Sequence, residues 1–510
     1  MRKHKTGGFL YSRWAVLVGL VLMFLGGVCF FAGEWYLENY GTLGFESILY
    51  TLTANLDGVQ SGLVTSFAKQ VGIRVLLFFS VIGFALFYPF RNRLVLKLKG
   101  KKTVRVRLYP FRRPAAFLLS ICIAAGTTAA AAVRTEFVKF LYYLGSPSVF
   151  YEETYVDPRN VQITFPEEKR NLICIYLESM ETTFFSEEEG GALEQNMVPE
   201  LHALAQEHIN FSHNDGVGGF FSPSGTQWTV AALLSQSAGI PLKTTPETGT
   251  NGYGADGTFL PGIDTLSDIL AENGYHQMVM FGSDATFGGR YAYYSSHGVQ
   301  EVRDLFTARE DGIVPEDYYT WWGMEDEHLY TYAKQELTKL ASGEEPFAFT
   351  MLTADTHHVD GYLCRLCENT RLEQYENVFR CASRQAADFI SWLQQQPFYE
   401  NTTIVIAGDH PSMDADYFSR QVDSDYDRRV YNCYINSALQ TGNFQNRQFT
   451  AMDMFPTTLA AMGCRIEGEQ LGLGINLFSG RPTLMEQLGQ EALNDELSRY
   501  SEFYMTNFLQ

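Results

Sequence analysis

The chain has 510 residues, 46% of them hydrophobic, and a formal net charge of −20. The charge is uneven. Residues 1–135 hold 17 Lys and Arg against 4 Asp and Glu, and residues 136–510 carry a net charge of −33. So acidic a region excludes most nucleic-acid binding, and it would repel an anionic substrate unless a local cation held it.

Three uncharged apolar stretches lie in the basic part of the chain, at 14–33, 75–90 and 115–133. A membrane-spanning helix needs about 20 apolar residues. The middle stretch reaches that length only if it begins near Val71 and includes Arg74. The first stretch could be a cleaved signal peptide, but it is longer than the apolar part of most of them. We therefore expect residues 1–135 to form a membrane anchor with three helices.

Basic residues predict the orientation of this anchor. The N-terminus is basic, and residues 91–113 contain ten Lys and Arg and no acid. Such loops stay in the cytoplasm, and the flanking apolar stretches disfavour the alternative of a nucleic-acid patch. With three spans, everything after about Arg134 lies on the extracytoplasmic face, as does the loop 34–70. We expect a multi-pass protein of the cell membrane.

The rest of the chain divides into a linker (136–168), a large domain (169–482) and a helical tail (483–510). In the domain, strand-like segments are expected at 171–177, 277–281, 347–353 and 402–407. Helix-like segments alternate with them, at 198–208, 226–236, 263–273, 326–342, 372–396 and 451–462. This alternation is typical of an α/β domain with a mostly parallel sheet.

Two of the expected strands end in potential metal ligands. The run TTIVIAGDH ends in Asp409 and His410, and the run NLICIYLES carries Glu178 next to its end. Ligands of open α/β sheets gather at the carboxyl ends of strands. The two runs therefore predict a metal site at one sheet edge, although an acid at a strand end is more often a cap or an ion-pair partner.

A threonine precedes one of the expected helices. Thr226 lies in SPSGTQWTVAALLSQ, where a turn leads into an apolar periodic segment. It could be a helix N-cap, or a nucleophile at a helix N-terminus, where phosphate groups bind well. An alcohol needs a metal or a base to become nucleophilic. Three oxygen ligands and one nitrogen, from Thr226, Glu178, Asp409 and His410, suit Mn²⁺ or Mg²⁺ better than the ions that thiolates select.

Three of the eight cysteines cluster in a polar stretch, at Cys364, Cys367 and Cys381. Outside the membrane a disulfide is the expected state, either Cys367–Cys381 or Cys364–Cys381. The Cys364-x-x-Cys367 spacing could instead mark a redox or zinc pair, but no second CxxC supports zinc.

Five segments together resemble a known family. They are NLICIYLESME (171–181), GTQWTVAALLSQSAGIPL (225–242), LTADTHHVDGY (352–362), TTIVIAGDHPSMD (402–414) and LGLG (471–474). In this order they resemble the phosphoglycerol transferases of the alkaline phosphatase/sulfatase superfamily. The nearest resemblance is to the enzymes that modify periplasmic glucans, and lipoteichoic acid synthases are more distant.

The resemblance implies an α/β/α sandwich behind the transmembrane helices, and a role for each matching residue. Glu178, Asp409 and His410 match the family's metal ligands, and Thr226 matches the nucleophile, which also contacts the metal. His357 matches a histidine that contacts substrate phosphate and moves a proton. Arg290 matches a phosphate-binding position, where the synthases also place an aromatic residue two positions earlier; that position is Gly288 here.

The resemblance also implies a function. The expected reaction moves glycerol phosphate from phosphatidylglycerol in the membrane to a hydroxyl of an extracytoplasmic glycan or polymer, through a phosphoglyceryl-threonine. The alternatives are a phosphoethanolamine transferase, a sulfatase or phosphodiesterase of the same superfamily, and a non-catalytic binding or sensor protein with the same fold. A sulfatase nucleophile would need a CxPxR or SxPxR pattern, which Ser222-Pro223 does not continue.

Overall fold

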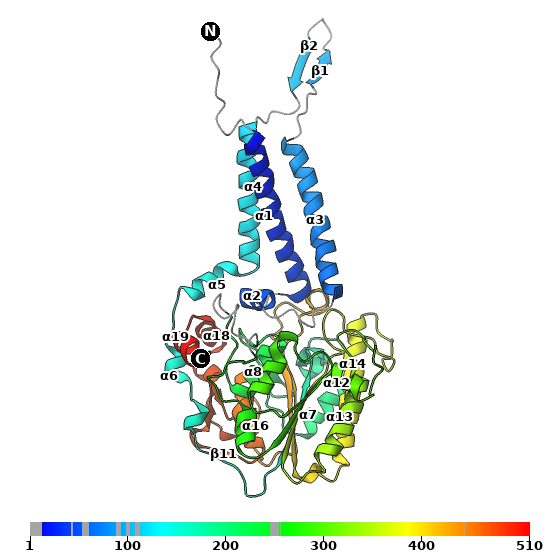
Figure 1. Ribbon diagram of the computed structural model, residues 1–510, viewed down its shortest axis with the longest axis vertical. Coiled ribbons are helices and arrows are strands. Elements are labelled where there is room, and N and C mark those ends of the chain that lie inside the picture. Colours follow the sequence, from blue (N-terminus) through cyan, green and yellow to red (C-terminus); the bar gives the residue numbers. More distant parts are fainter. Residues whose placement is uncertain are drawn as a thin grey trace. The chain divides into compact units, whose positions relative to one another are not determined.

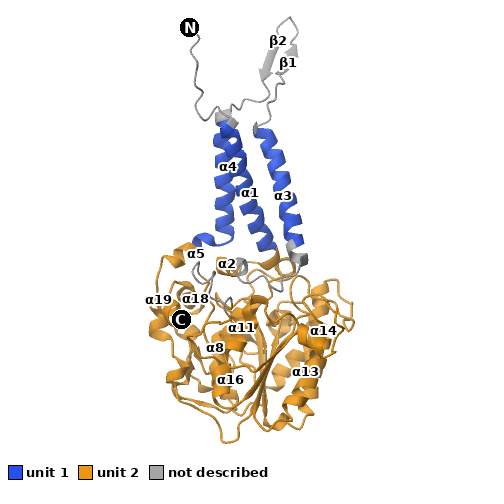
Figure 2. Ribbon diagram, viewed as in Figure 1, with its two compact units in different colours: residues 1–38, 60–139 blue, residues 39–59, 140–510 orange. Residues whose placement is uncertain are grey.

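The computed structural model describes residues 13–41, 44–53, 61–87, 93–97, 103–107, 113–244, 254, 257–442 and 444–510. It divides into two compact units (Figure 2). Unit 1 comprises residues 1–38 and 60–139, and unit 2 comprises residues 39–59 and 140–510.

Unit 1 contains three long apolar helices and one short hairpin. The helices are α1 (Arg13–Tyr40), α3 (Ser61–Phe87) and α4 (Arg113–Arg134). Each is long and apolar enough to cross a membrane, over Trp14–Tyr40, Thr65–Leu86 and Ala115–Arg134. The hairpin pairs β1 (Arg93–Lys97) with β2 (Thr103–Arg107) within the basic stretch.

The middle helix begins earlier than the apolar stretch 75–90 suggested. α3 continues through Arg74, whose guanidinium forms an ion pair with Glu38 at 2.8 Å. Opposite charges on neighbouring helices offset each other, so a charged residue can stand inside the span. Residues 88–90 of the expected stretch lie outside the described part of the chain.

Unit 2 is built on a seven-stranded sheet with the order β5-β10-β9-β4-β8-β6-β7. The bounds are β4 (Asn171–Leu177), β5 (Gly219–Phe220), β6 (His276–Phe281), β7 (Glu301–Arg303), β8 (Phe347–Leu352), β9 (Thr402–Gly408) and β10 (Val430–Ile435). The five strands from β9 to β7 are parallel, and β10 runs antiparallel to β9 and β5. The sheet is therefore mostly parallel, as expected.

Both faces of the sheet are buried, because successive strand residues point to opposite faces. In β4, Cys174 and Tyr176 belong to one hydrophobic core, and Ile173 and Ile175 belong to the other. The first core includes residues of α8 (Thr229–Ala238), α10 (Leu266–Glu272), α11 (Arg290–Ser296) and α16 (Met454–Ala461). The second includes residues of α7 (Pro199–Glu207), α12 (Leu305–Glu310), α13 (Asp326–Leu340), α14 (Gln374–Gln394) and α15 (Ala415–Gln421). The result is the expected α/β/α sandwich (Figure 1).

Smaller elements complete unit 2. The helices are α2 (Phe45–Thr53), α6 (Phe150–Thr154), α17 (Leu484–Leu488), α18 (Gln490–Ser498) and α19 (Glu502–Asn507), and α5 (Phe137–Leu144) crosses the boundary between the units. Two short antiparallel pairs are β3 (Ile163–Thr164) with β11 (Arg465–Ile466), and β12 (Gln470–Leu471) with β13 (Gly474–Ile475).

Candidate active site

The two acid-bearing strand ends meet because β4 and β9 are neighbouring parallel strands. Leu177 pairs with Gly408 in register, so Glu178 and Asp409 follow side by side. The ligand atoms of Glu178, Asp409 and His410 all lie within 4.8 Å of one another. The three residues are 2%, 0% and 0% exposed. The structure thus brings together the three charged residues expected at this edge of the sheet.

Hydrogen bonds orient each of these side chains. Asp409 Oδ1 accepts from the backbone N–H groups of Ser179 and His410, both at 2.8 Å, and the Ser179 hydroxyl donates to Glu178 Oε1 at 2.8 Å. The His410 Nδ1–H donates to the Pro411 carbonyl at 2.9 Å, which leaves Nε2 as the ligand atom. Ser179 was not anticipated from the sequence, although it is the next residue after a predicted ligand.

The inward-facing atoms fit a divalent cation. Asp409 Oδ2 is buried and has no hydrogen-bond partner in the described part of the chain. It lies 3.3 Å from His410 Nε2, which is 3.7 Å from Glu178 Oε1. A buried carboxylate oxygen without a partner is costly. Two acids and one imidazole are donors that Mn²⁺ and Mg²⁺ accept, so a metal ion would satisfy all three.

The electrostatics of the cluster point the same way. Burial raises the pKa of Glu178, and the nearby Asp409 raises it further. Burial alone would lower the pKa of His410, but Asp409 and Glu178 outweigh it and raise that pKa. The contributions of the two carboxylates to these shifts are those of neighbouring negative charges, which a bound cation would offset.

Thr226 lies in a tight turn just before α8. Its backbone N–H and its hydroxyl both donate to the Pro223 carbonyl, at 3.1 and 2.8 Å. The helix begins at Thr229 with Trp228 as its N-cap, so the expected start at 226 and the N-cap interpretation of Thr226 are wrong. The reason is local: Gly225 has φ +80° and Trp228 is extended, so the turn cannot be part of the helix.

A second threonine was missed by the sequence analysis. Thr229, the first residue of α8, has its hydroxyl 3.4 Å from His410 Nε2. The helix itself is fixed to the end of β9, because the Gln236 side chain donates to the carbonyls of Gly408 and Asp409, both at 3.1 Å. The N-terminal turn of α8 therefore faces the acid–imidazole cluster, which consists of Glu178, Asp409 and His410.

His357 lies on the loop that follows β8. Its Nδ1–H donates to the His358 carbonyl at 2.7 Å, and its ring packs at 4.3 Å on Trp322. Burial lowers the pKa of His357, and the nearby Glu178 opposes that shift. At neutral pH the ring is therefore mainly neutral, with its lone pair on Nε2.

Arg290 is buried and is not a surface ion-pair partner. It is 5% exposed and begins α11. Its guanidinium donates to the Phe287 carbonyl (3.0 Å), the Ser283 hydroxyl (3.0 Å) and the Asp284 carbonyl (2.5 Å). Burial lowers its pKa to about 10, so it stays charged at neutral pH, and Glu178 is the first group that opposes the shift.

The short helix α2 contacts two sides of this region within unit 2. The Tyr50 hydroxyl donates to the Gly288 carbonyl at 2.5 Å, and its ring lies 5.7 Å from that of Trp228. Just before α2 in the chain, Tyr40 is the last residue of α1 and belongs to unit 2. Its ring lies 5.0 Å from that of His358. An aromatic residue from a distant segment thus lies against Gly288, which has no side chain of its own.

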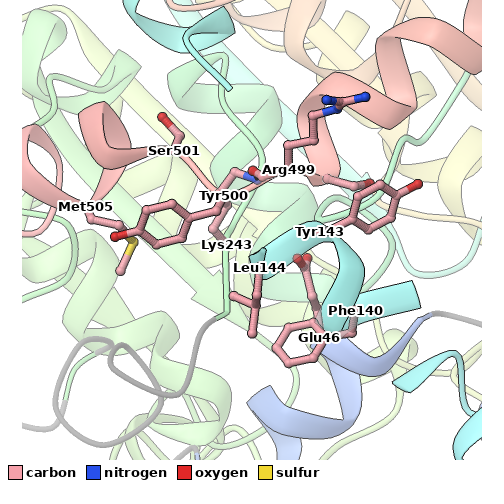
Figure 3. Close-up of a pocket in the computed structure, with 10 residues that line it drawn as sticks. Glu46, Phe140, Tyr143, Leu144, Lys243, Arg499, Tyr500, Ser501 and Met505 are labelled. Carbon is pink, nitrogen blue, oxygen red and sulfur yellow. The ribbon is translucent and has the colours of Figure 1, made fainter. Parts of the chain in front are cut away.

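One further pocket lies between α2, α5 and the segment that joins α18 to α19 (Figure 3). Glu46 and Lys243 are among its lining residues. The Lys243 ammonium donates to the carbonyls of Leu497 and Arg499. None of the residues predicted for the site lines this pocket.

The cysteine cluster differs from the expectation. Cys364 Sγ lies 3.5 Å from Cys367 Sγ and 3.7 Å from Cys381 Sγ. None of the eight cysteines, all of which are described, forms a disulfide. The expected bond from Cys381 to Cys364 or Cys367 is therefore absent, because the three sulfurs share one small volume without any pair reaching bonding distance.

Comparisons with known proteins agree with this geometry. Residues 170–464 match the Sulfatase family model. Phosphoglycerol transferase I of Xanthomonas campestris pv. campestris is 30% identical over 378 residues, which are 72% of this chain and 49% of the relative. Phosphoglycerol transferase I of Salmonella choleraesuis is 29% identical over 381 residues, 72% of this chain and 45% of the relative. The chain thus spans about half the length of these curated relatives.

Among solved structures, the integral membrane lipooligosaccharide phosphoethanolamine transferase A of Neisseria meningitidis shares the fold. The two align with a TM-score of 0.50 and 12% identity, over 94% of this chain and 88% of that one. The family model covers more than half of the 510 residues and contains all the residues that form the acid–imidazole cluster. The chain belongs to the sulfatase family.

Proposed function

We propose that the protein is a membrane-bound phosphoglycerol transferase that moves glycerol phosphate from phosphatidylglycerol to a hydroxyl of an extracytoplasmic glycan or polymer. The observation that carries the proposal is the buried cluster of Glu178, Asp409 and His410 beside the threonine-bearing N-terminus of α8. The curated relatives named phosphoglycerol transferase I support the choice of transferred group.

Glu178, Asp409 and His410, together with the Thr226 oxygen, would hold one divalent ion, which we propose to be Mn²⁺, with Mg²⁺ as the alternative. When bound, the ion supplies positive charge that favours a deprotonated alcohol and offsets charge on phosphoryl oxygens. Two observations support this assignment. Asp409 Oδ2 has no hydrogen-bond partner in the described residues, and the His410 Nδ1–H is bonded to the Pro411 carbonyl, which leaves Nε2 for the ion.

The proposed reaction consists of two displacements at phosphorus. In the first, Thr226 Oγ bonds to the donor phosphorus, and the bond to the diacylglycerol oxygen breaks. In the second, an acceptor hydroxyl oxygen bonds to the same phosphorus, and the bond to Thr226 breaks. Dividing the transfer in this way predicts ping-pong kinetics.

Arg290 and His357 serve the substrate in this scheme. Arg290 stays charged at neutral pH, and its guanidinium is held by three acceptors, so it can stabilise phosphate oxygens without reorganising. In the first displacement, His357 Nε2 takes the proton of the Thr226 hydroxyl and gives it to the departing diacylglycerol oxygen. In the second, it takes the proton of the acceptor hydroxyl and returns it to the departing Thr226 oxygen. Its depressed pKa and its Nδ1–H bond to the His358 carbonyl fit a neutral base that works through Nε2.

The membrane supplies the donor. We propose a multi-pass anchor over residues 1–135, a linker over 136–168, an extracytoplasmic catalytic domain over 169–482 and a helical tail over 483–510. Confining donor and site to one surface raises the effective donor concentration. α2, which follows the first apolar helix along the chain and contacts Trp228 and Gly288, would then guide a lipid headgroup to the site.

Incubating the full chain in detergent micelles with fluorescent phosphatidylglycerol and Mn²⁺ tests the proposal. We expect fluorescent diacylglycerol to be released, and intact mass spectrometry to find a glycerol phosphate adduct on a peptide that contains Thr226. Parallel reactions with phosphatidylethanolamine and with a sulfate ester test the other family activities. Turnover of one of these alone would contradict the proposed donor, and no turnover of any substrate would favour a non-catalytic protein.

A further inference from the structure

Cys364, Cys367 and Cys381 form a group of thiols that the proposed transfer reaction does not use. Two of their sulfur separations are 3.5 and 3.7 Å, and all three sulfurs lie within 4.8 Å of one another. Two thiolates that share a tetrahedral ion, with metal–sulfur bonds of about 2.3 Å, lie about 3.8 Å apart. The observed separations therefore match ligands arranged around one cation.

The local fold delivers the three sulfurs from two elements. Cys364 and Cys367 lie on the loop between β8 and α14, in a turn where the Cys367 N–H donates to the Cys364 carbonyl at 3.1 Å. Such a turn brings both side chains to one side. Cys381 comes from the second turn of α14. An ion bound here would tie the loop that carries His357 to the helix that follows it.

Donor groups point at the sulfurs. The Gln385 amide donates to Cys381 Sγ at 3.4 Å and approaches Cys364 Sγ at 4.0 Å. The Arg384 guanidinium donates to Cys381 Sγ at 3.8 Å. The thiolate, rather than the thiol, is the metal ligand.

The surroundings favour a bound cation over bare thiolates. Cys364 and Cys381 are 5% and 2% exposed, whereas Cys367 is half-buried and gives an ion access from solvent. Two buried acids, Asp326 and Asp355, interact electrostatically with Cys364. Each has a buried Oδ2 without a hydrogen-bond partner in the described residues. Unpartnered carboxyl oxygens near Cys364 fit a positively charged ion in this volume.

We propose that Cys364, Cys367 and Cys381 bind one thiophilic cation, Zn²⁺ or Cu⁺, as a three-thiolate site that clips the β8–α14 loop to α14. Thiolates select these ions over the Mn²⁺ or Mg²⁺ of the acid–imidazole cluster. Binding displaces the protons that the thiols carry into solvent and involves no change of oxidation state. Water completes the coordination of Zn²⁺ on the side of Cys367, and Cu⁺ needs no further ligand.

Metal release by a mercurial tests this site. The full chain in detergent is loaded with ZnSO₄ or, without oxygen, with Cu⁺, and is then desalted. We expect p-hydroxymercuribenzoate to release one equivalent of the ion from the wild type. Cys367→Ser, at the most exposed position of the three, should lose this equivalent. Cys464→Ser, the same change at a buried cysteine outside the cluster, should keep it.

Two further measurements make the outcome decisive. Glu178→Ala removes a ligand of the acid–imidazole cluster and should still retain the ion that the mercurial releases. Failure of the proposed function and failure of the cysteine site can therefore be told apart. Trypsin cuts after Arg365, Arg371, Arg380 and Arg384, and so puts each of the three cysteines on its own peptide. A disulfide between two of these peptides in protein purified without reductant, or wild type that holds no mercurial-released ion, would overturn the proposal.

Discussion

Asp326 and Asp355 hold the start of α13 against the end of β8 by reciprocal hydrogen bonds. The Asp326 N–H donates to Asp355 Oδ1 at 3.2 Å, and the Asp355 N–H donates to Asp326 Oδ1 at 3.3 Å. A third donor, the Ala354 N–H, reaches Asp326 Oδ1 at 2.7 Å. Both carboxyls are buried, and Asp355 precedes His357 by only two residues, so this pair helps to fix the loop of the active site.

The pair gives a pH dependence of stability. Burial raises the pKa of Asp326 to about 7, whereas an unfolded aspartate titrates near about 3.9. Between these two pKa values the Asp326 carboxyl is protonated in the folded state and ionised in the unfolded state. The free energy of unfolding therefore falls as pH rises from about 4 to 7. In metal-free protein, Asp326→Asn should flatten this fall in melting temperature, measured by tryptophan fluorescence.

The control for that experiment is Asp416→Asn, which changes an exposed acid of α15. It should reproduce the wild-type dependence, because the Asp416 side chain is exposed in the folded protein. If the melting temperature fell equally with pH in the wild type and in Asp326→Asn, the Asp326 carboxyl would be ionised in the folded protein.

Glu178→Gln should separate metal binding from folding. Glu178 and Asp409 are buried side by side, and each like charge disfavours the other. Removing one charge should raise the melting temperature of metal-free protein. Mn²⁺ should raise the melting temperature of the wild type, because an ion that binds only the folded state stabilises it. It should leave the melting temperature of the variant unchanged. Glu188→Gln, at an exposed position, serves as the control and should respond to Mn²⁺ like the wild type.

The two threonines near α8 make a matched pair for locating the nucleophile. Thr226→Ala should reduce diacylglycerol release by roughly a thousandfold or more. It should cost only about 1 kcal/mol of stability, because one hydrogen bond, to the Pro223 carbonyl, is lost. Thr229→Ala removes a hydroxyl 3.4 Å from His410 Nε2 and should leave the covalent adduct in place. An adduct that persists in Thr226→Ala and disappears in Thr229→Ala would reassign the nucleophile.

Arg428 should be a large contributor to the stability of the loop after His410. It binds Glu181 through two nitrogens, at 2.5 and 2.9 Å, and donates to the Ser412 carbonyl at 2.7 Å. Glu181 is fully buried, so Arg428→Ala leaves an unpaired charge and should cost about 2–4 kcal/mol in denaturant unfolding.

The control for Arg428 is Arg420→Ala, which breaks exposed ion pairs to Glu373 and Asp416 and should cost less than about 1 kcal/mol. Glu181→Gln added to Arg428→Ala should recover part of the loss, since the amide carries no charge. An equal cost for Arg428→Ala and Arg420→Ala would mean that the Glu181 carboxyl finds another partner.

Local pattern determined much of this fold. The apolar runs predicted β4 at its observed bounds, and β6, β8 and β9 within one residue, because buried parallel strands are almost continuously apolar. Strand β10 was missed. Its run VYNCYI lacks the flanking pattern of the others, and its place is set by pairing with β9 and β5.

By itself, the sequence determined that Glu178, Asp409 and His410 stand at strand ends, because the ligand follows each strand directly in the chain. Only the tertiary structure decided which strands are neighbours, and so which ligands meet. It also decided that α8 starts at Thr229, that Arg290 is buried and that three cysteines converge without a disulfide. These outcomes depend on contacts between residues far apart in the chain, whose energies no local pattern contains.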